Sequence, residues 1–82
     1  MMKRIEKMDT LMKILNEIDD SINWEKEKAV IDDRLLDSFG VITLVSELED
    51  AFGIEIEASE MAAENFNSAE AMYQMILRLK EK

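Results

Sequence analysis

The sequence predicts an all-α protein of four helices, with a short third helix and a long loop between the first two. Three observations favour this class. The chain has no proline and only two glycines, Gly40 and Gly53, so it lacks the turn residues that β-hairpins use. Apolar residues recur at spacings of three and four along three segments, residues 5–18, 41–52 and 69–79. The length of 82 residues is that of one domain, which we expect over residues 1–82.

The first helix is predicted over residues 3–18. Its apolar side chains share one buried stripe, formed by Ile5, Met8, Leu11, Met12, Leu15 and Ile18. Residues 22–37, which follow, show no clear period. A loop of this length in a small domain has to be held by its own apolar side chains or has to serve a function. We therefore expect Trp24, within this loop, to cover the core rather than to contact a ligand.

The second helix is predicted to begin at Asp37 or Ser38 and to end at Phe52. Asp37 is a favourable N-cap because its carboxylate can accept the free amide hydrogens of the first turn. Gly53 stands where a left-handed C-terminal cap is expected. The core face of this helix comprises Val41, Leu44, Val45, Leu48 and Phe52.

Phe39 and Ile42 are apolar but do not belong to that core face. They lie on another face of the helix, beside Ser38. An apolar patch with a charged rim is typical of a docking surface. The acids that follow on this helix supply such a rim: Glu47, Glu49 and Asp50. In the structural alternative, Phe39 simply packs into the long loop.

The remaining segment is predicted to be extended at first and then helical. Apolar and acidic residues alternate over residues 54–57. Ser59 is predicted to cap the short helix, over residues 60–64, and either Asn67 or Ser68 is predicted to cap the last helix. The buried stripe of that last helix comprises Ala69, Met72, Ile76 and Leu79.

The charge of the chain is strongly acidic, with a formal net charge of −9. Residues 35–77 contain nine acids and no lysine or arginine. This pattern argues against nucleic acids and anionic membranes as partners and favours basic proteins. The chain also lacks an apolar run long enough to span a membrane and an apolar signal core at its N-terminus, so we expect a cytoplasmic location.

The chain contains no histidine and no cysteine, which removes the usual general base, the usual metal ligands and any Ser-His triad. An enzyme built from this chain would need a carboxylate pair such as Glu55 and Glu57. Because these residues alternate with isoleucines, a solvated edge is the simpler interpretation. We therefore expect no catalytic residues and no metal site.

The sequence resembles the acyl carrier protein family over nearly its whole length, most strongly at LLDSFGVITLVSELEDAFGIEIE and ENFNSAEAMYQMI. The resemblance implies a four-helix bundle that carries 4′-phosphopantetheine on Ser38 through a phosphodiester, attached by a phosphopantetheinyl transferase from coenzyme A. The resemblance also implies a monomeric carrier and two further kinds of partner: a loading ligase or synthase, and acceptor enzymes with basic docking patches. The residues of this chain that match the family's partner contacts are Asp37, Phe39, Ile42, Glu47, Glu49 and Asp50.

The segment LLDSFG is similar to the D-alanyl carrier proteins that feed teichoic-acid alanylation, and to stand-alone carriers of other cargo. Many fatty-acid carriers have glycine at the position of Leu36, an acidic or polar residue at Gly40, and glutamate at Thr43. The sequence leaves open a D-alanyl, other aminoacyl, fatty-acid or polyketide cargo. The alternative function is a non-carrier interaction module that docks through the face containing Phe39 and Ile42.

Overall fold

The computed structural model describes the backbone of residues 4–81 and the side chains of residues 7–81. Its helices are α1 (Arg4–Ile18), α2 (Ser38–Phe52), a 3₁₀ helix (Ala58–Glu60), α3 (Ala63–Phe66) and α4 (Ala69–Lys80). No strand occurs within residues 4–81, so the predicted all-α class with a short third helix is confirmed. The predicted start of the first helix at Lys3 and the side chain of Ile5 lie outside the described residues.

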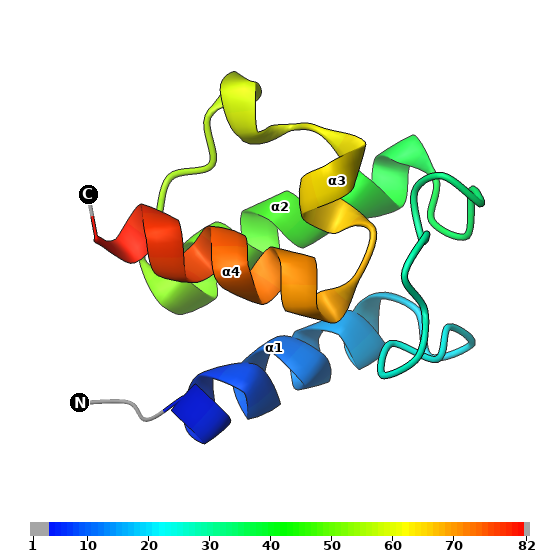
Figure 1. Ribbon diagram of the computed structural model, residues 1–82, viewed down its shortest axis with the longest axis horizontal. Helices are drawn as coiled ribbons and strands as arrows, with labels where there is room; N and C mark the ends of the chain where they lie inside the picture. The colour runs from blue at the N-terminus through cyan, green and yellow to red at the C-terminus, as the bar shows by residue number, and fades with distance from the viewer. Residues whose placement is uncertain (1–3, 82) are drawn as a thin grey trace.

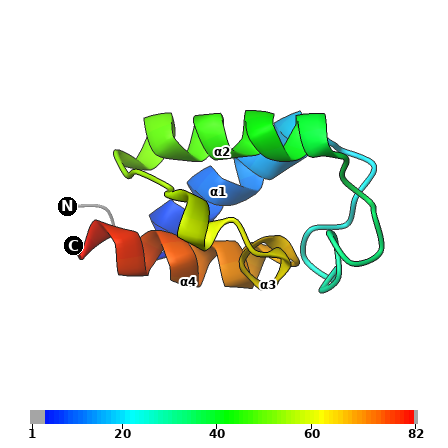
Figure 2. The same cartoon turned by 90° about the horizontal axis from the view of Figure 1, so that it is seen from above.

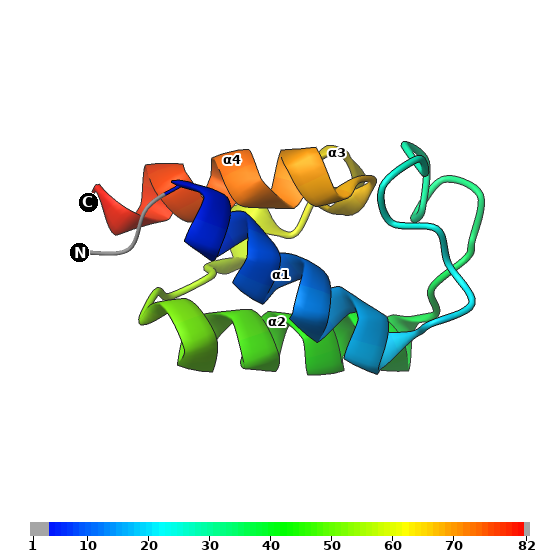
Figure 3. The same cartoon turned by 90° about the horizontal axis from the view of Figure 1, so that it is seen from below.

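The helices are arranged so that α1 runs opposite to α2 and α4 (Figures 1 and 3). Viewed from above, α2 and α4 form the two long sides of the molecule, with α1 crossing behind them (Figure 2). The described part of α1 begins, and α4 ends, at one end of the bundle, whereas the long loop closes the other end. The start of α2, at Ser38, therefore lies beside that loop. Within residues 4–81, no helix has both the length and the apolar character to span a membrane.

One hydrophobic core joins all four helices and the loop. Side chains that are entirely buried include Leu11 and Leu15 of α1, Leu44 and Leu48 of α2, and Ile76 of α4. Burial of a side chain of this size stabilises the fold by about 1.5–3 kcal/mol. The wider core adds Ile22, Trp24, Val30, Phe52, Ile56, Phe66, Ala69, Met72, Tyr73, Met75 and Leu79. The stripe predicted for the last helix lies entirely in this core, as do Leu44, Leu48 and Phe52 of the stripe predicted for the second helix. The rest of that second stripe is less buried: Val45 is half-buried against the core, and Val41 is half-buried outside it.

The long loop enters the core through its apolar residues, as predicted. Trp24 is 2% exposed, and its Nε1–H donates to the backbone oxygen of Asp19 at 3.0 Å. The carboxylate of Asp19 accepts hydrogen bonds from the Ser21 hydroxyl and from the Ser21 backbone N–H, and these bonds lower the pKa of Asp19. Trp24 therefore covers the core, and the only polar atom of its side chain has a hydrogen-bond partner.

Asn67 fixes the second half of the loop, a role that the sequence does not reveal. Its side-chain oxygen accepts the backbone N–H groups of Ile31 at 2.9 Å and Asp32 at 3.0 Å. Its backbone oxygen accepts the N–H of Val30 at 2.9 Å, and its Nδ2 donates to the Asp32 carboxylate at 3.0 Å. One residue at the junction of α3 and α4 thereby holds the chain that leads to Ser38.

Replacing Asn67 with alanine is expected to lower the free energy of unfolding by about 1–2 kcal/mol, because the partly buried N–H of Ile31 and the exposed N–H of Asp32 lose their acceptor. Urea unfolding followed by circular dichroism measures this loss. Asn23→Ala is the matched control, since Asn23 is exposed and only its backbone oxygen accepts hydrogen bonds. Equal stabilities of the two variants would contradict the role of Asn67.

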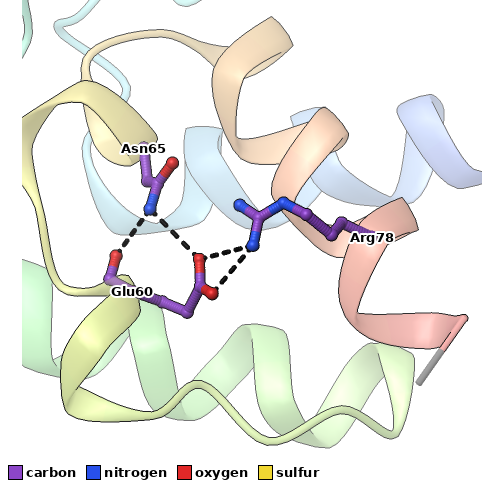
Figure 4. A network of polar contacts seen from close by, with 3 residues as sticks. All are labelled: Glu60, Asn65 and Arg78. Carbon is purple, nitrogen blue, oxygen red and sulfur yellow. Dashed lines mark hydrogen bonds and ion pairs between the residues drawn. The ribbon is translucent and has the colours of Figure 1, made fainter.

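The predicted bounds of the short helix are wrong. Ser59 lies inside the 3₁₀ helix, and α3 starts only at Ala63, after Ala62, which makes no side-chain cap. The reason is a tertiary contact (Figure 4): the Glu60 carboxylate accepts two hydrogen bonds from Arg78 of α4, both at 2.8 Å. Asn65 Nδ2 also donates to the Glu60 backbone oxygen at 2.8 Å. These bonds hold Glu60 in the turn before α3. Ser68, one of the two predicted caps of the last helix, accepts the N–H of Ala71 at 3.0 Å and is confirmed.

Candidate attachment site at the start of α2

The start of α2 is organised by Asp37. This residue has an extended backbone, and its carboxylate accepts the N–H of Gly40 at 2.8 Å, while its backbone oxygen accepts the N–H of Val41 at 3.0 Å. The prediction that Asp37 caps the helix is therefore confirmed. The other end is confirmed as well: Gly53 adopts φ 63°, the left-handed conformation in which glycine carries no steric penalty.

Ser38 is the first residue of α2 and is exposed. Among the described residues, its hydroxyl makes no hydrogen bond. The backbone N–H groups of the first helical residues have no acceptor inside a helix and carry the positive end of its dipole. The N–H of Gly40 is taken by Asp37, so a phosphodiester on this hydroxyl would stand in solvent next to the N–H groups of Ser38 and Phe39, which have no acceptor among the described residues. The site fits a covalently attached anionic group.

Gly40 allows the residue before the cap to lie against the helix. A Cβ atom at Gly40 would stand 2.7 Å from Leu36 Cδ1 and 3.0 Å from Leu36 Cγ. Contacts this short require Leu36 to move, although its side chain is half-buried and packs against the core. The glycine, which is unfavourable inside a helix, is therefore explained by the close packing of Leu36 over the first turn.

The Gly40→Ala variant is expected to miss the gain of about 0.5–1 kcal/mol that alanine normally brings to a helix. Displacement of Leu36 offsets that gain. In the Leu36→Ala background the two closest atoms are gone and only Asp37 Oδ1, at 3.3 Å, stays near the added Cβ, so the same Gly40→Ala change should recover most of the gain. Urea unfolding of the four proteins of this double-mutant cycle measures the coupling. A Gly40→Ala effect that is the same in both backgrounds would contradict the packing explanation.

The apolar residues predicted for docking are exposed. Phe39 is 79% exposed and Ile42 is 65% exposed. Phe39 therefore does not pack into the long loop, and the structural alternative for this residue is wrong. Two such side chains within one helical turn form a small apolar patch directly after Ser38.

The acids predicted for docking differ in their surroundings. Glu47 and Asp50 are exposed on α2. Glu49 is half-buried, and its carboxylate accepts the backbone N–H of Ile56 at 2.8 Å. Its backbone oxygen accepts the N–H of Gly53 at 3.0 Å. Glu49 thus holds the segment after α2, and its assignment as a partner contact stays a prediction.

A small apolar hollow lies between the start of α2, the loop and α3. Its volume is about 70 Å³, and it is lined by Ile31, Val41, Met61, Ala62, Ala63 and Phe66. For comparison, an engineered apolar cavity that binds benzene has a volume of ~150 Å³. The hollow therefore has room for a side chain of a few heavy atoms and not for a long hydrocarbon chain.

The start of α2 presents an exposed hydroxyl behind a helix cap. The described residues contain no cluster of three or more potential metal ligands. Among the described residues, no ionisable side chain forms a hydrogen bond with the Ser38 hydroxyl. This arrangement leaves the Ser38 hydroxyl accessible for the covalent attachment of a group.

Comparison with known proteins identifies the class of protein. The family described as the phosphopantetheine attachment site matches residues 9–76, and the chain belongs to this family. It is therefore a non-catalytic carrier whose cofactor is covalently bound 4′-phosphopantetheine, and this favours the carrier over the non-carrier interaction module. A D-alanyl carrier protein of Streptococcus suis (strain 05ZYH33) is 28% identical over 72 residues, which cover 87% of this chain and 91% of that protein. No solved structure was found to match the chain.

Proposed function

We propose that Ser38 is the residue that carries the phosphopantetheine, and that this carrier serves a small aminoacyl cargo such as D-alanine. The single observation that supports Ser38 is its exposed, unengaged hydroxyl at the first position of α2, behind the Asp37 cap. The prosthetic group, when bound, supplies the thiol that holds the cargo as a thioester. The chain itself contributes a fixed anchor point and free helix amides for the phosphodiester.

The small cargo is supported by two independent observations. The apolar hollow between the start of α2, the loop and α3 measures only about 70 Å³, and the central side chains of α2 and α4 are entirely buried, namely Leu44, Leu48, Met72 and Ile76. An alkyl chain would therefore have to displace the core, whereas an aminoacyl group can remain in solvent. The similar Streptococcus suis protein is, by its name, a D-alanyl carrier.

The test of the cargo uses the phosphopantetheinylated protein. One reaction offers D-alanine, ATP and a ligase that loads D-alanine onto carriers. The other offers a medium-chain fatty acid, ATP and an acyl–carrier synthetase. Intact mass should show the D-alanyl product and little fatty-acyl product. Efficient fatty-acyl loading, with amide chemical shifts that spread from α2 into Met72 and Ile76 of α4, would contradict the proposal.

Partner enzymes are proposed to dock on the exposed side of α2, through Phe39, Ile42, Glu47 and Asp50, with Asp37 and Glu49 at its ends. Basic patches on those enzymes would complement the acidic character of residues 35–77, which contain nine acids and no lysine or arginine. The monomeric state, the single domain over residues 1–82 and the cytoplasmic location stay predictions.

A further inference from the structure

A second hollow lies between α1 and α2, away from the small apolar one. Its volume is about 240 Å³, and it is lined by Ile14, Glu17 and Ile18 of α1 and by Thr43 and Glu47 of α2. The C-terminal half of α1 crosses the first half of α2 at this point (Figure 3). We call it the α1–α2 hollow.

The floor of the α1–α2 hollow is apolar and its edges are acidic. Ile14 and Ile18 are half-buried and pack against the core, so their outer surfaces remain available. Glu17 and Glu47 are exposed, one on each helix. The Thr43 hydroxyl already donates to the Phe39 backbone oxygen at 3.0 Å. The remaining strong polar groups are therefore the two carboxylates.

Among the described side chains, neither Glu17 nor Glu47 takes part in an ion pair. No basic residue lines the hollow, although Lys13 precedes Ile14 in the sequence. Two acids on facing helices above an isoleucine floor complement a side chain with an apolar stem and a cationic head.

The hollow is continuous with the exposed part of α2. Phe39, Thr43 and Glu47 follow one another at intervals of four residues, so they form one row along the helix. The row begins with Phe39, which is 79% exposed, and ends at the edge of the hollow. A partner that covers Phe39 therefore also reaches the α1–α2 hollow.

We propose that the α1–α2 hollow receives an arginine side chain of a partner protein, with the stem against Ile14 and Ile18 and the guanidinium between Glu17 and Glu47. Arginine fits better than lysine because its planar head can donate to two carboxylates at once and is more weakly hydrated. The proposal deepens the proposed function, since the partners would be the enzymes that act on the carrier. It adds α1 to a docking surface otherwise confined to α2.

The test uses the full chain labelled with ¹⁵N and titrated with millimolar acetyl-arginine amide. Amide shifts should saturate and should be confined to residues 14–18 and 43–47. The variant Glu17→Gln/Glu47→Gln should weaken this binding roughly tenfold. The control variant Glu55→Gln/Glu57→Gln removes the same charge from exposed residues outside the hollow and should bind as the wild type does.

Three outcomes would overturn the proposal. The first is a set of shifts spread over all acidic segments, or equal binding by both double variants. The second is equal binding of acetyl-citrulline amide, which has the same shape without the charge. The third is a set of shifts at these residues that grows with protein concentration without any probe, which would assign the hollow to a second copy of the chain. The Ser38→Ala variant should bind the probe normally, so failure here is separate from failure of the attachment site.

Discussion

The Ser38→Ala variant is expected to keep its unmodified mass after incubation with coenzyme A, magnesium and a broad-specificity phosphopantetheinyl transferase, whereas the wild type gains one phosphopantetheinyl group. The loss should be complete, because alanine has no hydroxyl with which to form the phosphodiester. The fold should be retained, since Ser38 is exposed and the cap of α2 depends on Asp37. Intact-protein mass spectrometry measures the modification, and circular dichroism verifies the helices.

Ser46→Ala is the matched control for that experiment. Ser46 is also an exposed serine of α2 but lies two turns further along the helix, where no free amides stand nearby. This variant should be modified as the wild type is. Modification of Ser38→Ala would contradict the assignment, and so would loss of modification in Ser46→Ala.

The Leu44→Ala variant is expected to lose about 3 kcal/mol of the free energy of unfolding. Leu44 is entirely buried, so the substitution removes apolar contacts and leaves a cavity in the core. A domain of this size has a total stability of roughly 4–12 kcal/mol, so the loss is a large fraction of it. Urea unfolding measures the change, and the thermal midpoint should fall with it.

Ile42→Ala provides the contrast, two residues earlier on the same helix. Ile42 is 65% exposed, and its truncation should change the stability by no more than about 0.5 kcal/mol. Its effect should be seen in partner binding instead, as a raised KM of the transferase with the holo product still formed. A large loss of stability in Ile42→Ala, or none in Leu44→Ala, would contradict the orientation of α2.

The bounds of α2 could be predicted because local chemistry determines them. Asp37 accepts an amide three residues ahead, and Gly53 adopts a conformation that other residues avoid, so both signals are contained in a few residues of sequence. The buried stripe of α4 followed from helical periodicity in the same way. The fold class and the position of Ser38 at a helix start rest on these local signals.

The bounds of the short helix could not be predicted from the sequence, because contacts with residues far away in the chain determine where it begins and ends. Glu60 bonds to Arg78, eighteen residues later, and Asn67 bonds to the loop thirty-five and thirty-six residues earlier. A helix of four residues contributes too little on its own to resist such contacts. The polar residues Glu60 and Asn67 are ordinary in sequence, and only the tertiary fold shows what they hold.

At the candidate site, too, some features could be predicted from local sequence and others depend on the tertiary fold. The exposure of Phe39 and Ile42 follows from the helical period once the core face is known. The half-buried position of Glu49 does not, since it depends on how the chain returns after Gly53 and brings Ile56 N–H to its carboxylate. The hollow between α1 and α2 likewise requires the crossing of two helices that are separated in sequence by the long loop.

The most direct test of the central claim is to locate the prosthetic group on the wild-type protein. The chain is modified by the transferase, digested, and its peptides are fragmented by tandem mass spectrometry. The modification should lie on the peptide that contains Asp37, Ser38 and Phe39, and the fragments on either side of Ser38 should assign it to that residue. A modification on any other residue, or a wild-type protein that stays unmodified under conditions in which a known carrier is converted, would contradict the claim.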